Sequence, residues 1–228
     1  MSREVTQKIE LYRVLASEGV FVKKVDKGTP NSRERTYLNP KTEKEETVTE
    51  DVVKAFTGYI RNIELQEQDW GEVILVTLVE DDGNQVSLSF NADSNFGTDL
   101  MKKLPNVDFL KLVRLAPYSF ETKEGKKMRG VTIEQAAEKV TSFFSEKDGD
   151  SYKSINGFPE PKGDTSKFTK KNWRDYFGVT VYNFLRDHTV EKVLPVFEDL
   201  GPMPIEVNHL DREKDSAKVE LTDEEIPF

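Results

Sequence analysis

The sequence contains no cysteine and only two histidines, His188 and His209, among its 228 residues. Without cysteine the chain has no disulfide framework, no thiolate metal ligand and no thiol nucleophile, which fits a reducing cytoplasm. Two histidines are too few for ordinary zinc chemistry, because catalytic zinc usually takes three protein ligands. We therefore expect no metal site and no cofactor.

Long apolar segments are also missing. No run of about 18 apolar residues is present, and the first residues, Met1 to Glu4, lead into a polar stretch rather than the apolar core of a signal peptide. We expect a protein that stays in the compartment where it is made and has no membrane partner.

The motifs of common enzyme classes are absent as well. The sequence has no phosphate-cradling glycine loop and no nucleophile elbow. Abundant carboxylates, such as Asp81, Asp82 and Asp93, leave a metal-dependent nuclease as one hypothesis, but no paired motif with a supporting lysine or histidine accompanies them. We expect a protein that is not an enzyme.

Charge is unevenly distributed along the chain. The formal net charge is -9, which alone speaks against binding to phosphates. Residues 97–133, however, hold eight lysines and arginines against four acids, and residues 162–174 hold five against one. The acids gather in residues 63–83, with seven acids and no lysine or arginine, and in residues 209–228, with seven acids against three bases. Basic surfaces can therefore exist on an acidic protein.

Residues 55–133 are rich in β-branched and aromatic residues that are interrupted by turn signals, which is typical of a small all-β unit. Asp69-Trp70-Gly71 and Asp82-Gly83 predict two turns. The predicted strands are 55–66, 72–80, 84–90, 107–119 and 127–133, with a helix over 95–104 capped by Thr98. Three strands, a helix and two strands follow the order of the five-stranded OB-fold β-barrel.

The rest of the chain is predicted to add helices to this barrel. Apolar spacing predicts amphipathic helices over 4–17, 134–145 and 170–187, and a further helix over 190–200 contains Pro195. Residues 27–50 are predicted to be a loop or linker. The predicted class is mainly β with added helices (α+β): one OB-fold domain over 1–208, with its barrel core at about 55–133, and a disordered, flexible acidic tail over 209–228.

The last six residues combine acids with an apolar tip. Asp223, Glu224 and Glu225 precede Ile226-Pro227-Phe228. The two apolar side chains can enter a hydrophobic pocket while the terminal carboxylate meets a cation, and Pro227 limits the entropy lost on binding. A tail that only aids solubility has no need of such a tip, because an exposed apolar group is costly unless a partner buries it.

In these six residues the chain resembles the single-stranded DNA-binding proteins of bacteria and their phages, which end in an acidic stretch followed by Ile-Pro-Phe or a terminal Phe. The resemblance implies non-specific binding of single-stranded DNA during replication, recombination or repair. It also implies that the tail recruits a polymerase, helicase, primase or exonuclease. The added helices and the length resemble a diverged, phage-encoded member, which implies the cytoplasm of a bacterial host and leaves a homo-oligomer open.

Non-specific strand binding needs flat rings for bases and cations for phosphates. Rings and cations are interleaved on the predicted strands and turns, and residues 123–129 hold four cations. The candidate DNA-binding residues are Tyr59, Arg61, Trp70, Arg114, Tyr118, Phe120, Lys123, Lys126, Lys127 and Arg129. For each ring the alternative is a place in the core, and for each cation a solvated surface. Lys170, Lys171 and Arg174 form a further basic cluster, in which Trp173 belongs to the apolar stripe of a helix.

A different class of function also fits the sequence. The chain could be a protein-binding adaptor whose tail mimics that of a single-strand binder and occupies host replication enzymes, a hypothesis that the net charge of -9 favours. The salt dependence of DNA affinity separates the two hypotheses, because only phosphate binding weakens steeply as salt rises.

Overall fold

The computed structural model describes residues 9–39, 42–149 and 151–200. Its strands are β1 (Glu10–Leu15), β2 (Val20–Lys24), β3 (Arg33–Asn39), β4 (Lys44–Val53), β5 (Phe56–Gln68), β6 (Gly71–Val79), β7 (Gln85–Asn91), β8 (Val113–Glu121), β9 (Lys127–Gln135), β10 (Glu138–Lys139), β11 (Ser145–Asp148) and β12 (Ser151–Ser154). Its helical segments are α1 (Asn95–Lys103), η1 (Leu104–Asn106), η2 (Thr165–Lys167), α2 (Lys170–Asp175), η3 (Tyr176–Val181), α3 (Tyr182–His188), η4 (Thr189–Val193) and α4 (Leu194–Leu200).

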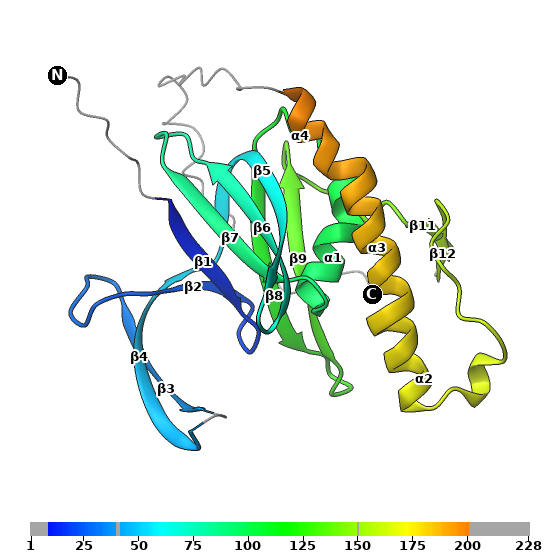
Figure 1. Cartoon of the computed structure of the whole chain (residues 1–228), viewed down its shortest axis with the longest axis horizontal. Helices are drawn as coiled ribbons and strands as arrows, with labels where there is room; N and C mark the ends of the chain where they lie inside the picture. The colour runs from blue at the N-terminus through cyan, green and yellow to red at the C-terminus, as the bar shows by residue number, and fades with distance from the viewer. Residues whose placement is uncertain (1–8, 40–41, 150, 201–228) are drawn as a thin grey trace.

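Ten strands form one curled sheet in the order β10-β9-β8-β5-β6-β7-β1-β2-β4-β3 (Figure 1). The strands β5, β6, β7 and β9 and the helix α1 lie close to their predicted bounds, but the strand predicted over 107–119 begins only at Val113, as β8. Both predicted turns are present, between β5 and β6 and between β6 and β7. The cap of α1 is Ser94 rather than Thr98, since the Ser94 side chain accepts a hydrogen bond from the Gly97 N–H.

The predicted closed five-stranded barrel is wrong. Closure of such a barrel would need β9 to reach the free edge of β7, but β1 already pairs in parallel with β7 and extends the sheet. In the described part of the chain β9 pairs with β8 and β10 alone. The result is a large mixed sheet, so the OB-fold assignment is withdrawn.

The N-terminal predictions are also corrected. The helix predicted over 4–17 is the strand β1 in its described part, because pairing of β1 with β2 and β7 outweighs the local helical spacing. The loop predicted over 27–50 contains the β3–β4 hairpin, which projects from the sheet (Figure 1). Polar cross-strand pairs stabilise this hairpin: Arg35 donates two hydrogen bonds to Glu50, and the Tyr37 hydroxyl donates one to Glu46.

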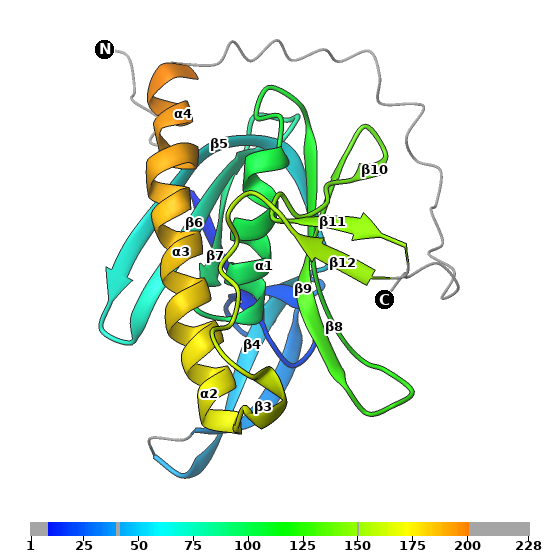
Figure 2. The same cartoon turned by 90° about the vertical axis from the view of Figure 1, so that its right-hand side faces the viewer.

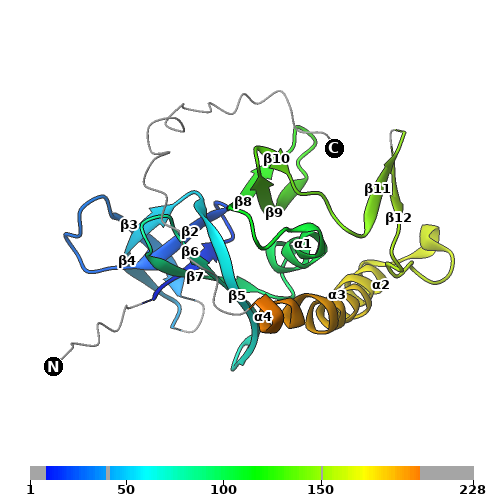
Figure 3. The same ribbon diagram turned by 90° about the horizontal axis from the view of Figure 1, so that it is seen from above.

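One continuous helical run, residues 170–200, packs beside α1, which lies between this run and the sheet (Figure 3). The helices predicted over 170–187 and 190–200 are confirmed as parts of it. Its η4 segment is π-helical and comes directly before Leu194 and Pro195. Such widening suits a proline, which lacks an N–H and crowds the carbonyl one turn earlier. The helix predicted over 134–145 is wrong, because β9 continues to Gln135 and a turn leads into β10.

The core is enclosed by the curled sheet and α1. The side chains of Ile60, Leu78 and Leu115 are fully buried on the sheet, and Leu100 of α1 packs among them. On β2, the Phe21 ring lies 5.4 Å from that of Phe56, which links the N-terminal strands to the same core. This packing fixes which face of β8 and β9 is turned outward.

Candidate nucleic-acid interface

The outward face of the β8–β9 hairpin carries the candidate aromatic residues. Along β8, Val113, Leu115 and Pro117 are buried, and the intervening side chains therefore point away from the core. Tyr118 and Phe120 share this outward face, with ring centroids 5.8 Å apart and ring planes inclined by 35°. The Phe120 ring is 38% exposed. Two neighbouring rings on one open face offer bases a surface on which to stack.

Tyr118 lies across the neighbouring strand at Gly130. A Cβ atom at Gly130 would lie 2.4 Å from the Tyr118 hydroxyl oxygen and 2.4 Å from Oδ2 of Asp99 on α1. Only glycine therefore leaves room for the ring. Burial, and after it the charge of Asp99, raises the pKa of Tyr118 to about 12, so its hydroxyl is neutral at physiological pH.

The β1–β2 turn supports the same segment from the other side. Gly19 has φ +65°, and a Cβ atom there would lie 2.2 Å from the backbone nitrogen of Ser119. The two backbones touch, which is possible for glycine because it has no side chain. The outward face of β8 is thus held between Gly19 and Gly130, and the Tyr118 ring is preorganised.

Cations extend beyond the rings in the turn that joins the two strands. Lys123 and Lys126 are exposed in this turn, together with the acid Glu124. Within the described residues neither lysine takes part in an ion pair, so both are available to a phosphate. Arg114 lies on the ring-bearing face, but its guanidinium is 3.0 Å from Oε2 of Glu134 and its charge is partly compensated.

Register places Tyr59 of β5 on the same face. Thr57 pairs with Arg114, so Thr57 and Tyr59 follow each other on the outward side of β5. The Tyr59 side chain is 38% exposed. Arg61 stands at the bulge between Ile60 and Asn62, where the alternation of faces is interrupted. From here on, the ring face denotes Tyr59, Arg114, Tyr118 and Phe120 with the turn lysines Lys123 and Lys126.

Four of the candidate residues are not assigned to the ring face: Arg61 at the bulge, Lys127, Arg129 and Trp70. Lys127 pairs with Glu121 and Arg129 with Ser119, so both side chains belong to the opposite face of the hairpin. Trp70 is 64% exposed in the β5–β6 turn, which lies on the opposite side of the molecule from the β8–β9 turn (Figure 2). The structure therefore separates Trp70 from the aromatic residues of β8.

Four of the seven acids of residues 63–83 stand on the β5–β6 hairpin, on β5, in the turn and at the start of β6. Glu72 at the start of β6 accepts hydrogen bonds from Tyr182 and Arg186 of α3, which hold this hairpin against the long helical run. The other three acids, Glu80, Asp81 and Asp82, follow β6 directly after Val79, which pairs with Tyr59. The structure therefore moves part of the acidic stretch, but not all of it, away from the ring face.

Gly130 and Asp99, which lie beside the Tyr118 hydroxyl, were not identified from the sequence, although Gly130 left a signal. Glycine inside a strand often marks the close approach of another group, and Gly130 stands in the middle of β9. Asp99 gave no comparable signal, because its role depends on the packing of α1 against β9.

Other candidate sites can be placed more briefly. The partner-binding residues Asp223, Glu224, Glu225, Ile226, Pro227 and Phe228 lie outside the described residues. In the described part of the chain no group of three or more histidines or acids is arranged to hold a metal ion. No helix there is both long and apolar enough to cross a membrane.

A cavity of about 620 Å³ lies away from the ring face, between the loop before β8 and the η4–α4 segment. Phe109, Phe143 and Val196 contribute to its lining, and His188 and Lys192 add polar groups. None of the candidate DNA-binding residues lines this cavity. Comparisons of the chain with protein-family models, with curated proteins and with solved structures returned no match.

Proposed function

We propose that this protein binds single-stranded DNA without sequence specificity and that its acidic C-terminal segment recruits replication, recombination or repair proteins. The observation that carries the proposal is the ring face. Tyr118 and Phe120 offer adjacent rings, and the turn that follows them carries Lys123 and Lys126, which form no ion pair with any residue that the structure describes. Rings can stack on any base and cations can contact any phosphate, so binding of this kind does not depend on the sequence of the DNA.

The distribution of charge supports the same function. Four of the seven acids of residues 63–83 stand on the β5–β6 hairpin, where Glu72 contacts Arg186 of the long helical run. Single-stranded DNA on Tyr118 and Phe120 therefore meets the lysines of the β8–β9 turn, on the opposite side of the molecule from the β5–β6 turn (Figure 2). The net charge of -9 is compatible with DNA binding when it is partitioned in this way.

Recruitment of partners rests on the sequence of the last six residues. Ile226 and Phe228 suit a hydrophobic pocket, and the preceding acids favour a basic rim around it. Replication and repair enzymes with such pockets are the proposed partners, in the cytoplasm of a bacterial host.

Binding to fluorescently labelled oligo-dT tests the DNA-binding function. Phe120→Ala should weaken affinity by about fivefold or more, because stacking contributes about 1–3 kcal/mol per base. Lys123→Ala/Lys126→Ala should reduce the slope of log affinity against log salt by about 1.4, since each phosphate contact to a single strand contributes about 0.7. The matched control is Lys44→Ala/Lys147→Ala, which removes two exposed lysines from β4 and β11.

The same titration decides against the proposal if the wild-type protein does not bind oligo-dT at low salt. That outcome favours the adaptor hypothesis. In that hypothesis the ten-stranded sheet binds a protein partner, and the acidic tail binds host replication enzymes in place of a single-strand binder. An equal loss in the control pair and in the turn pair would show that total charge, rather than the ring face, determines affinity.

A further inference from the structure

A second group of rings, one exposed and three partly buried, lies at the start of the long helical run. We define the α2 patch as Phe168, Trp173, Tyr176 and Phe177. The Trp173 and Phe177 rings are stacked, with centroids 5.6 Å apart and planes inclined by 20°. Phe168 lies 5.0 Å from Trp173, and Tyr176 lies 4.8 Å from Phe177. Four rings thus form one continuous aromatic surface.

This surface is not accounted for by core packing. The helical run contributes Val181, Leu185 and Val193 to the core, each nearly fully buried. Phe177, by contrast, is 52% exposed, and Trp173 is half-buried. Exposed clustered rings mark a binding surface more often than isolated ones do, because a ligand that covers them recovers the cost of their hydration.

The positions of the rings are fixed before any ligand arrives. The Thr169 side chain accepts a hydrogen bond from the Asn172 N–H, and the Asn172 side chain accepts one from the Thr169 N–H. This capping box fixes the start of α2. The Tyr176 hydroxyl donates to the carbonyl oxygen of Pro159 at 2.7 Å, which holds its ring. Rings that are already ordered lose little entropy on binding.

Positive charge surrounds the α2 patch. Lys170, Lys171 and Arg174 are exposed on the same helix, and Asp175 is the exposed acid among them. Lys167 is compensated by Asp164, with the two charged atoms 3.2 Å apart. Within the described residues the other three cations take part in no ion pair. The ligand that this combination fits is an anionic chain bearing flat apolar rings.

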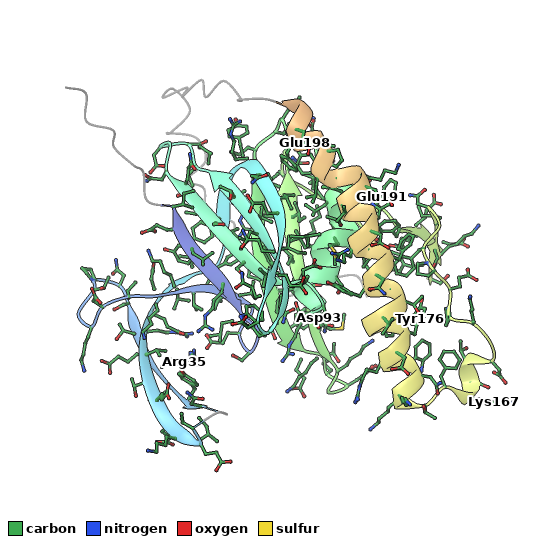
Figure 4. All side chains as sticks on the ribbon, in the orientation of Figure 1. Arg35, Asp93, Lys167, Tyr176, Glu191 and Glu198 are labelled. Atoms are coloured by element: carbon green, nitrogen blue, oxygen red, sulfur yellow. The ribbon has the colours of Figure 1, made fainter. Side chains whose placement is uncertain are left out.

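We propose that the α2 patch is a second contact for unpaired nucleic acid, in which bases stack on Phe177 and Trp173 while Lys170, Lys171 and Arg174 meet phosphates. This inference rests on the proposed function and adds a site to it. The α2 segment and the β8–β9 turn both lie toward the lower end of the molecule in Figures 1 and 2, on opposite sides of it in Figure 2. Figure 4 labels Tyr176 in the lower part of the helical run and Lys167 in the segment before it. A single strand of DNA that contacts both surfaces would cross this lower end.

A single tryptophan allows the α2 patch to be observed separately. Trp70→Phe leaves Trp173 in the α2 patch as the sole tryptophan, and Trp173→Phe leaves Trp70 in the β5–β6 turn, which is not part of the ring face. Adding a 30-nucleotide oligo-dT at low salt should quench the fluorescence of Trp173 in the first protein. Phe177→Ala should weaken affinity for the same oligonucleotide by about fivefold or more. Lys170→Ala/Lys171→Ala should lower the salt slope by about 1.4 relative to the Lys44→Ala/Lys147→Ala control.

The outcomes distinguish this inference from the proposed function. If the wild-type protein binds oligo-dT while Trp173 fluorescence and the Phe177→Ala affinity are both unchanged, the α2 patch is not a nucleic-acid contact and the ring face stands alone. If the wild-type protein does not bind oligo-dT, the proposed function itself fails. Circular dichroism of Phe177→Ala checks that the helical run remains folded, and Phe177→Leu, which keeps the apolar volume without the ring, should lose affinity in the same way.

Discussion

Glu50 is a buried carboxylate on β4 that is surrounded by guanidinium groups. Arg35 donates two hydrogen bonds to it, at 2.7 and 2.9 Å, and the guanidinium groups of Arg13 and Arg33 each lie 3.7 Å from one of its oxygens. The hydrogen bonds from Arg35, and after them the positive charges, hold the pKa of Glu50 below its usual value. This one residue ties the projecting β3–β4 hairpin to β1.

A pH dependence follows from this environment. Because the folded-state pKa is lowered, ionised Glu50 stabilises the fold above its usual pKa of about 4.5, and that stability is lost as pH falls through the folded-state value. Glu50→Gln should therefore lower the free energy of unfolding at pH 7 by about 1–3 kcal/mol. The difference from wild type should shrink as pH falls below 4.5, as measured by urea unfolding at each pH.

Glu80 provides a control of opposite sign. Burial, together with the charge of Asp82, raises the pKa of Glu80. Its ionised form therefore opposes folding, and Glu80→Gln should raise stability at pH 7. A Glu50→Gln protein that loses equal stability at pH 7 and at pH 3 would show that side-chain packing, rather than charge, is responsible.

At the scale of elements, α1 completes the exposed edge of β9. The Val131 N–H donates to Oδ2 of Asp99 at 2.7 Å, and the Lys103 ammonium donates to the Val131 carbonyl at 2.6 Å. Asp99 and Lys103 also form an ion pair at 2.8 Å. Asp99 and Lys103, one helical turn apart, thus make the hydrogen bonds to Val131 that the backbone of a further strand would otherwise make. The edge of β9 is therefore covered by α1 rather than by another β-strand.

Removing one of these groups should weaken the docking of α1. Asp99→Ala leaves the N–H of the fully buried Val131 without an acceptor, and we expect a loss of about 1–3 kcal/mol in the free energy of unfolding. Asp99→Asn keeps an acceptor oxygen and should lose less. Urea unfolding measures both variants, and hydrogen exchange at the Val131 amide should accelerate in Asp99→Ala. Equal stabilities of the two variants would contradict the role of the acceptor.

The strands of residues 56–135 could be predicted because their signals are local. Alternating apolar residues and turn pairs such as Asp82-Gly83 identify them without knowledge of their partners. The period of two also predicts a shared face for Tyr59 and Arg61, but the bulge between Ile60 and Asn62 interrupts it there. The strands β1, β3 and β4 could not be found in this way, because residues such as Tyr37 and Glu46 stabilise them through partners rather than through an apolar pattern.

Local sequence signals could not predict whether the sheet closes or where Trp70 lies, because both depend on contacts between residues far apart in the sequence. Whether β9 reaches β7 depends on β1, which is more than 70 residues away from β7 in sequence. Where the Trp70 turn lies depends on the contact of Glu72 with Arg186, a pair separated by 114 residues. Long-range contacts of this kind decide the geometry of the candidate interface, whereas the local pattern decides only its composition.

At the scale of the whole molecule, the acidic tail and the basic surfaces belong to one chain. Residues 209–228 carry seven acids and three bases, a contribution of -4 to the net charge of -9, so the remaining residues carry -5. An anionic segment tethered to a protein with cationic surfaces competes with DNA for them, and the competition weakens as salt screens it. The tail can therefore reduce DNA affinity without contributing to the interface.

Deleting residues 223–228 tests this division of labour. The truncated protein should bind oligo-dT as tightly as the full chain or more tightly, with the difference largest at low salt, because three tail carboxylates and the terminal tip are gone. If the proposed recruitment is right, it should also fail to bind a bacterial replication polymerase that the full chain binds.

Phe228→Ala keeps every side-chain charge and removes the ring, so it should retain the DNA affinity of the full chain and lose only the binding to the polymerase. Fluorescence anisotropy with labelled oligo-dT and surface plasmon resonance with the polymerase measure the two effects separately. A truncated protein that no longer binds DNA would place the tail within the strand-binding surface itself, since electrostatic competition acts only in the opposite direction.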